Sequence, residues 1–86
     1  MDIILNTEEI NYLNEKKFLT PKLMEYIKFA TKISSENYAI DIDENDALKI
    51  REKCADELMI CGFDDNYTPT HEGTILENLI DKFYVP

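Results

Sequence analysis

The feature that most constrains this fold is a run of apolar residues, spaced three and four apart, between residues 45 and 61. Its members are Ala47, Leu48, Ile50, Cys54, Ala55, Leu58, Met59 and Cys61. This spacing puts one apolar face on a helix and does not fit the alternation of a strand. Asp43 or Asn45 can cap the start, because a short side-chain oxygen accepts from a free N–H of the first turn. We therefore expect a central helix around which the chain packs.

The end of this helix is predicted at Gly62, as a left-handed residue that commonly closes a helix. Phe63 would then fold back on the last turn, onto Leu58 or Met59. Such a closure gives a sharp stop before the acidic loop of residues 64–67.

Two shorter helices are predicted in the first third of the chain. Asn6 with Glu9 three residues later has the form of a capping box, so a first helix runs to about Lys17. Thr20 as cap and Pro21 as first helical residue favour the start of a second, because the N–H that proline lacks needs no partner there. The predicted buried stripe of this second helix is Leu23, Met24, Ile27, Ala30 and Ile33.

The remaining elements are an extended segment and a last helix. Residues 36–43 alternate in a weak strand pattern, with residues 2–5 as a candidate partner. Thr68 or Thr70 caps a last helix, in which Gly73 indicates close approach to a neighbouring backbone. The apolar face of that helix is Ile75, Leu76, Leu79, Ile80 and Phe83. The sequence thus predicts one all-α domain over residues 1–86, with about four short helices and one short extended segment.

The charge of the chain is uneven. Its 86 residues carry a net charge of −9, and all of that excess lies in residues 36–86. Such a field repels nucleic acid and anionic membranes and attracts basic proteins or cations. Cys54 and Cys61 lie about 10 Å apart along the central helix, too far for a disulfide, which favours a reducing compartment. No membrane-length run or signal peptide is evident, so we expect the cytoplasm.

A calcium loop is the first candidate site. Asp41, Asp43, Asn45, Ala47, Lys49 and Glu52 fall at positions 1, 3, 5, 7, 9 and 12 of a pattern that resembles an EF-hand. Asp46 replaces the usual glycine, Lys49 puts a cation where an oxygen is wanted, and the helical pattern runs through the loop. We therefore predict no metal and no cofactor, and keep a calcium-responsive or regulatory adaptor as an alternative.

Catalysis is not indicated by any pattern in the chain. His71 is the single histidine and is expected on the surface of a first helical turn. Acid–base chemistry needs a partnered, perturbed group in a cleft, and no nucleophile stands beside a base here. We predict a non-enzymatic protein.

An acidic protein-binding face is the third candidate site. Acids cluster before the central helix and again after it, and a tyrosine stands at the outer rim of each cluster. The predicted partner-binding residues are Tyr38, Asp41, Asp43, Glu44, Asp46, Asp64, Asp65 and Tyr67. Carboxylates would steer a basic partner and the rings would supply contact area. The two clusters lie at opposite ends of one helix, so they need not form a single patch.

The segment GFDDNYTPTHEGTILENLIDKF, from Gly62 to Phe83, resembles the tail of small bacterial immunity proteins encoded beside secreted or contact-delivered toxins. The shared features are a Gly-aromatic-Asp helix end, an Asn-Tyr loop, a Thr-x-Glu-Gly helix start and a final Leu/Ile-rich helix. The resemblance implies a cytosolic inhibitor that covers the cationic active site of a basic toxin, such as a nuclease. A structural subunit that self-associates remains a further alternative.

Overall fold

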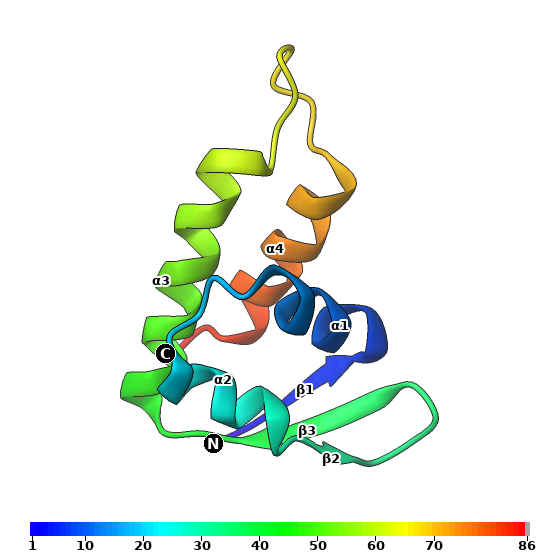
Figure 1. Cartoon of the computed structure of the whole chain (residues 1–86), viewed down its shortest axis with the longest axis vertical. Helices are drawn as coiled ribbons and strands as arrows, with labels where there is room; N and C mark the ends of the chain where they lie inside the picture. Colours follow the sequence, from blue (N-terminus) through cyan, green and yellow to red (C-terminus); the bar gives the residue numbers. More distant parts are fainter. Residues whose placement is uncertain (86) are drawn as a thin grey trace.

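The computed structural model describes residues 1–85 and contains a small sheet at the base of four helices (Figure 1). The elements in chain order are β1 (Asp2–Asn6), α1 (Thr7–Lys16), α2 (Pro21–Lys28), β2 (Thr31–Lys32), β3 (Asn37–Asp41), α3 (Glu44–Cys61) and α4 (His71–Lys82). In Figure 1, α3 rises from the base, a loop turns at the top, and α4 descends beside it.

The sheet has the order β1-β3-β2, and both pairings are antiparallel. β3 is therefore central, with Asp2 opposite Asp41 at one end of the β1 pairing and Asn6 opposite Asn37 at the other. Side chains alternate between the two faces of a strand. Ile3 is buried against the helices, whereas Ile4 on the other face is 43% exposed.

The expected all-α class is wrong, because three antiparallel strands lie beside the four helices. The suggested pairing of the extended segment with residues 2–5 is confirmed, and it places β1 along β3. The second helix is shorter than its predicted stripe, because it ends at Lys28. Residues 31 and 32 pair with β3 instead, and Ile33 is 53% exposed. Pairing with β3 satisfies backbone N–H and C=O groups, and this tertiary gain overrides the local helical spacing.

Helix starts follow the sequence closely. The Asn6 side chain accepts from the backbone N–H of Glu9 at 2.8 Å, and the Glu9 carboxylate accepts from that of Asn6 at 2.9 Å, so the capping box is confirmed. Thr20 caps α2, Asp43 caps α3 and Thr70 caps α4. Each cap supplies an oxygen to a first-turn N–H that has no partner within the helix.

The predicted closure of the central helix is wrong in its geometry. The helix does end at Cys61, but Gly62 has φ −78°, which is not left-handed. Phe63 does not fold back in a left-handed cap; it forms an isolated antiparallel bridge with Pro69. Close approach at Gly73 is confirmed, since a Cβ there would overlap the Gly62 carbonyl oxygen and lie 2.9 Å from its carbon.

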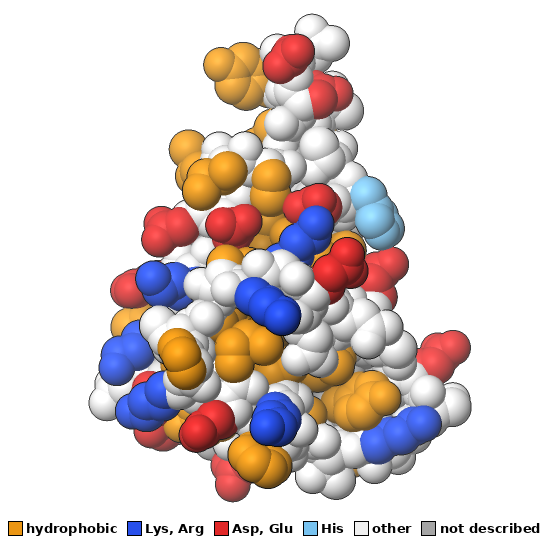
Figure 2. Space-filling model, in the orientation of Figure 1, with side chains coloured by type: hydrophobic (Ala, Val, Ile, Leu, Met, Phe, Trp, Pro, Cys, Tyr) orange, Lys and Arg blue, Asp and Glu red, His pale blue; other side chains and the backbone are white. Residues whose placement is uncertain are grey.

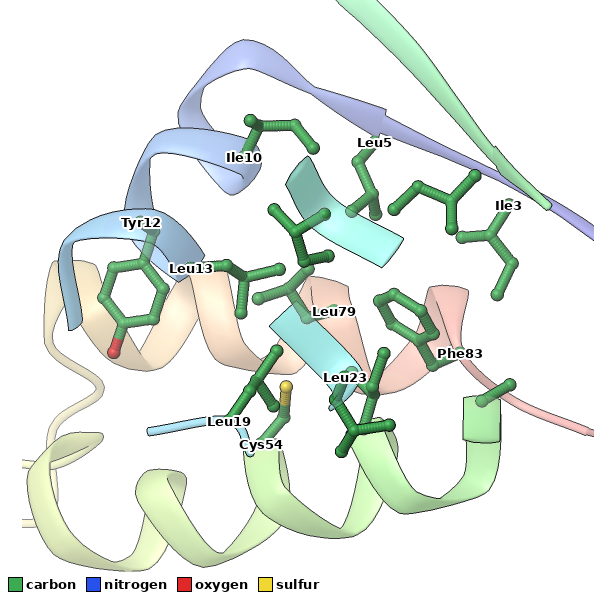
Figure 3. Packing of buried hydrophobic residues seen from close by; sticks show 14 of the residues in the cluster. Ile3, Leu5, Ile10, Tyr12, Leu13, Leu19, Leu23, Cys54, Leu79 and Phe83 are labelled. Atoms are coloured by element: carbon green, nitrogen blue, oxygen red, sulfur yellow. The ribbon is translucent and has the colours of Figure 1, made fainter. Parts of the chain in front are cut away.

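The hydrophobic core lies between the sheet and the helices, and Figure 3 shows its side chains converging from every layer. The fully buried apolar side chains include Leu5, Leu13, Ile40, Ile50, Cys54, Leu76, Leu79 and Phe83. The predicted buried face of α3 is wrong at two positions, since Leu48 is 43% and Met59 82% exposed. Ala47, Ile50 and Cys54 are buried as expected. The upper part of α3 contacts the core through Leu58 and Cys61 and leaves its other side exposed.

Candidate protein-binding site

The predicted acidic residues lie at two ends of the molecule. Asp41, Asp43 and Glu44 stand at the base of α3, and Asp64 and Asp65 lie in the loop that follows it. α3 has 18 residues, which corresponds to roughly 27 Å at 1.5 Å per residue. The two clusters are therefore separate surfaces, with the loop at the far end from the sheet (Figure 1).

The basal cluster consists of Asp41, Asp43 and Glu44, and all three are exposed. The hydroxyl of Tyr26 donates to Asp46, and this bond is the main cause that raises the pKa of Tyr26 to about 12. Burial and the charges of Asp43 and Asp41 add to the shift. The carboxylates thus crowd one region where α2, β3 and α3 meet.

Asp46 is not an exposed contact residue. It is 2% exposed and lies beside Tyr26 at 2.5 Å, Lys22 at 3.8 Å and Lys49 at 3.7 Å. The Tyr26 hydrogen bond lowers the pKa of Asp46, the two lysines lower it further, and burial opposes them. Its charge is therefore neutralised within the fold, and it joins α2 to α3.

Tyr38 also faces the protein. It lies in β3 opposite Leu5, is half-buried, and packs against the core. The rim of the basal cluster therefore lacks the exposed ring that the sequence suggested.

The EF-hand resemblance does not correspond to a loop in the structure. α3 begins at Glu44, so Asn45 and every later ligand position lie on a helix. Asp43 uses its side chain to cap Asp46 N–H at 2.7 Å. Within residues 1–85, no three His, Cys, Asp or Glu side chains are grouped so as to hold a metal ion.

The loop between α3 and α4 is a closed, hydrogen-bonded turn. Asp64 N–H donates to the Thr68 carbonyl at 3.0 Å, and Tyr67 N–H donates to the Asp64 carbonyl at 2.9 Å. The Asp64 carboxylate accepts from the N–H groups of Asn66 at 2.8 Å and Thr68 at 3.0 Å. Asp64 therefore holds the loop in shape, in addition to carrying charge.

Tyr67 has an unusual backbone conformation, with φ 59°. Tyr67 is the last residue of the turn Asp64–Tyr67. In three-residue hairpin loops the residue at this left-handed position is usually glycine. A residue with a Cβ is disfavoured there by roughly 1–2 kcal/mol. The Tyr67 side chain is 85% exposed, so burial in the free protein does not offset that cost.

Three more apolar side chains are exposed near the same end: Met59 at 82%, Ile60 at 77% and Phe63 at 38%. We call these three residues and Tyr67 the distal patch. Sequence reasoning named Tyr67 as a contact residue but missed the other three, because Met59 was assigned to the buried helix face and Phe63 to a closure against it. Ile60 gave a usable signal, since it falls outside the three-and-four spacing of that face.

The segment from the middle of α3 to the end of α4 is acidic, and Lys16 of α1 pairs with one of its acids, Glu72, at 3.4 Å. Residues 54–81 contain no Lys or Arg, and their acids are Asp56, Glu57, Asp64, Asp65, Glu72, Glu77 and Asp81. In Figure 2, the upper end of the visible face shows hydrophobic and acidic side chains, and the basic ones begin below it. Apolar contact area and a single sign of charge therefore occur together at this end.

A polar cluster below the loop, Tyr12, Cys61 and Glu72, was not predicted. The Cys61 thiol and the Tyr12 hydroxyl each donate to Glu72 Oε2 at 3.2 Å. Burial and the neighbouring Glu72 raise the pKa of Cys61, and the bond from Cys61 is the first cause that lowers the pKa of Glu72. The thiol is held protonated, which disfavours its use as a nucleophile.

His71 is the first residue of α4 and is exposed, as expected. Its Nε2 lies 3.2 Å from Glu8 Oε2 on the surface between α1 and α4. This pair joins two helices but lies outside any enclosed site.

The site is that of a small α/β protein with one acidic, partly apolar end. No family model matches the chain, and no curated protein or solved structure matches it either. Among residues 1–85, no helix has the length and apolar character needed to cross a membrane.

Proposed function

We propose that this chain is a non-enzymatic inhibitor of the immunity type, which neutralises a basic toxin, such as a nuclease, by covering its active site in the bacterial cytoplasm. The observation that carries the proposal is that residues 54–81, which include the distal loop with Asp64 and Asp65, hold seven acids and no Lys or Arg. A nuclease must present cations to its substrate phosphates, and a carboxylate-rich surface can occupy the same groove.

The charge distribution favours protein binding over chemistry. An unbalanced field of one sign raises the rate of encounter with an oppositely charged partner by 10-fold or more. The groups that could act chemically lack the setting that catalysis needs: the pKa of the Cys61 thiol is raised by burial and Glu72, and the His71–Glu8 pair lies on the open surface. Inhibition by occupation of a groove requires none of them to react.

The two acidic clusters contribute differently to this proposal. Asp64 and Asp65 lie beside exposed apolar side chains, so charge and contact area can act together at the distal end. The basal residues Asp41, Asp43 and Glu44 add to the long-range field. Asp46 and Tyr38 contribute through the fold, since both are engaged inside it.

The test is co-purification with the product of the neighbouring gene, followed by a toxicity assay in cells that express that product. We expect a stable complex, protection of the cells, and an association rate that falls as salt is raised. Absence of a complex at low salt would refute the proposal. An association rate that does not depend on salt would remove the electrostatic mechanism.

A further inference from the structure

Four of the ten large apolar side chains that are exposed among residues 1–85 belong to the distal patch. Met59, Ile60 and Tyr67 are each more than three-quarters exposed, and Phe63 lies between them in the chain. Single exposed apolar side chains are ordinary, but these four fall within residues 59–67 at one end of the molecule, which makes that end a candidate interaction surface. Met and Tyr are also residue types that are enriched at protein interfaces.

Tyr67 provides an independent reason to assign binding to this end. Its left-handed φ of 59° is disfavoured for a residue with a Cβ, and glycine would fill the position without that penalty. The ring is 85% exposed, so packing within the chain does not account for tyrosine there. Strained, exposed residues of this kind gather at functional sites.

The loop that carries Tyr67 is held ready for contact. The Asp64 carboxylate binds two backbone N–H groups, and the bridge from Phe63 to Pro69 closes the neck of the loop. Thr70 adds a hydrogen bond from its hydroxyl to the Cys61 carbonyl at 2.9 Å. A loop that is already ordered loses little entropy on binding, and this improves affinity.

The charge around the patch selects the occupant. Asp56, Asp64 and Asp65 are exposed acids close to it in the chain, without a Lys or Arg from residue 54 to 81. A second copy would bring like charges together, and an anionic membrane surface would be repelled. A protein with an apolar pocket inside a basic rim complements both the rings and the carboxylates.

We propose that the distal patch, and not the basal cluster, is the docking surface, with Tyr67 inserted in an apolar pocket within the basic face of the partner. This inference rests on the proposed function and adds which end binds and which side chain anchors the complex. Asp64 acts in it as a positioning residue, because its carboxylate shapes the loop that presents Tyr67.

The experiment measures the affinity of six purified proteins for the neighbouring gene product. They are the unaltered chain, Tyr67→Gly, Lys17→Gly, Asp64→Asn, Asp64→Ala, and the basal triple variant Asp41→Asn, Asp43→Asn, Glu44→Gln. Lys17 is the matched control, because its φ of 53° is also left-handed and it lies at the end of α1. Its replacement relieves the same backbone conformation away from the patch.

We expect Tyr67→Gly to weaken binding by about 30-fold or more, the range of an anchor residue. Lys17→Gly should leave affinity within about 3-fold, and the basal triple variant should lower mainly the association rate. For Asp64, Asn should retain affinity better than Ala, because the amide oxygen can still accept from the loop N–H groups.

The outcomes separate the two proposals. If the unaltered chain binds and Tyr67→Gly binds equally well, the docking inference is wrong while the inhibitor function stands. The same holds if the basal triple variant loses more affinity than Tyr67→Gly. If the unaltered chain does not bind, the inhibitor function fails and the docking inference fails with it. The inference would also be overturned if the unaltered free chain sediments as a dimer and Tyr67→Gly sediments as a monomer, since the occupant of the patch would then be a second copy.

Discussion

Replacing Tyr67 by glycine should make the free protein more stable. The left-handed backbone at Tyr67 costs roughly 1–2 kcal/mol for a residue with a Cβ, and glycine removes that cost. Glycine also increases the conformational entropy of the unfolded chain, which lowers the free energy of unfolding by about 0.5–1 kcal/mol. The ring is 85% exposed, so its removal loses little burial. The net gain lies within about 0–1.5 kcal/mol, with a central value of about 0.75 kcal/mol.

The assay is thermal unfolding of the isolated chain, followed by circular dichroism and by calorimetry. In a domain of this size 1 kcal/mol shifts Tm by roughly 4–8 °C, so the central value corresponds to a rise of about 3–6 °C. Lys17→Gly should give a rise of similar size, because the same backbone conformation is relieved there. Urea denaturation gives an independent free energy of unfolding.

A fall in Tm for Tyr67→Gly would refute the reasoning, because it would mean that the side chain stabilises the free fold. A rise for Lys17→Gly together with a fall for Tyr67→Gly would locate the error in the loop and not in the backbone argument. A gain in stability combined with a loss of binding would identify Tyr67 as a residue retained for contact.

Three further predictions concern the fold. Gly73→Ala should destabilise by about 2 kcal/mol or more, measured by urea denaturation, since its Cβ would overlap the backbone of Gly62; an unchanged midpoint would contradict the close packing of α3 on α4. Ile50→Ala, at a fully buried position, should cost about 2–5 kcal/mol, whereas Ile60→Ala should change the free energy of unfolding by less than about 0.5 kcal/mol; equal losses would show that the end of α3 is packed. The pKa of Asp46 is lowered in the fold, so the stability it contributes is present above its usual pKa of 3.8 and is lost as pH falls through the lower folded value. The difference in free energy of unfolding between the unaltered protein and Asp46→Asn should therefore shrink in acid. A difference that stays constant with pH would argue against the lowered pKa.

Local chemistry made the helix starts predictable. Asn6 with Glu9, Thr20 with Pro21, and Asp43 each act within a few residues, so the sequence contains everything the cap requires. The strand pairing was partly readable for the same reason, since the alternation in residues 37–41 is local. Strand β2 was not readable, because Thr31 and Lys32 are extended only through their partners in β3.

The candidate site could likewise be predicted only in part. The sequence located the acids and tyrosines, but not which of them reach the surface. Asp46 carries the same charge as Asp43 and lies three residues away, yet Tyr26, Lys22 and Lys49 enclose it. Met59 has helical spacing suited to a core, yet it lies on the side of α3 that is left exposed.

By itself the sequence determined the helix starts, the close approach at Gly73 and the acidic character of the second half, because these depend on residue type and short spacing. Only the tertiary structure decided the sheet, the separation of the two acidic clusters and the exposure of the distal patch. Each of those depends on which distant segments of the chain pack together. The local pattern of a helix or strand does not show how far the elements packed against it extend.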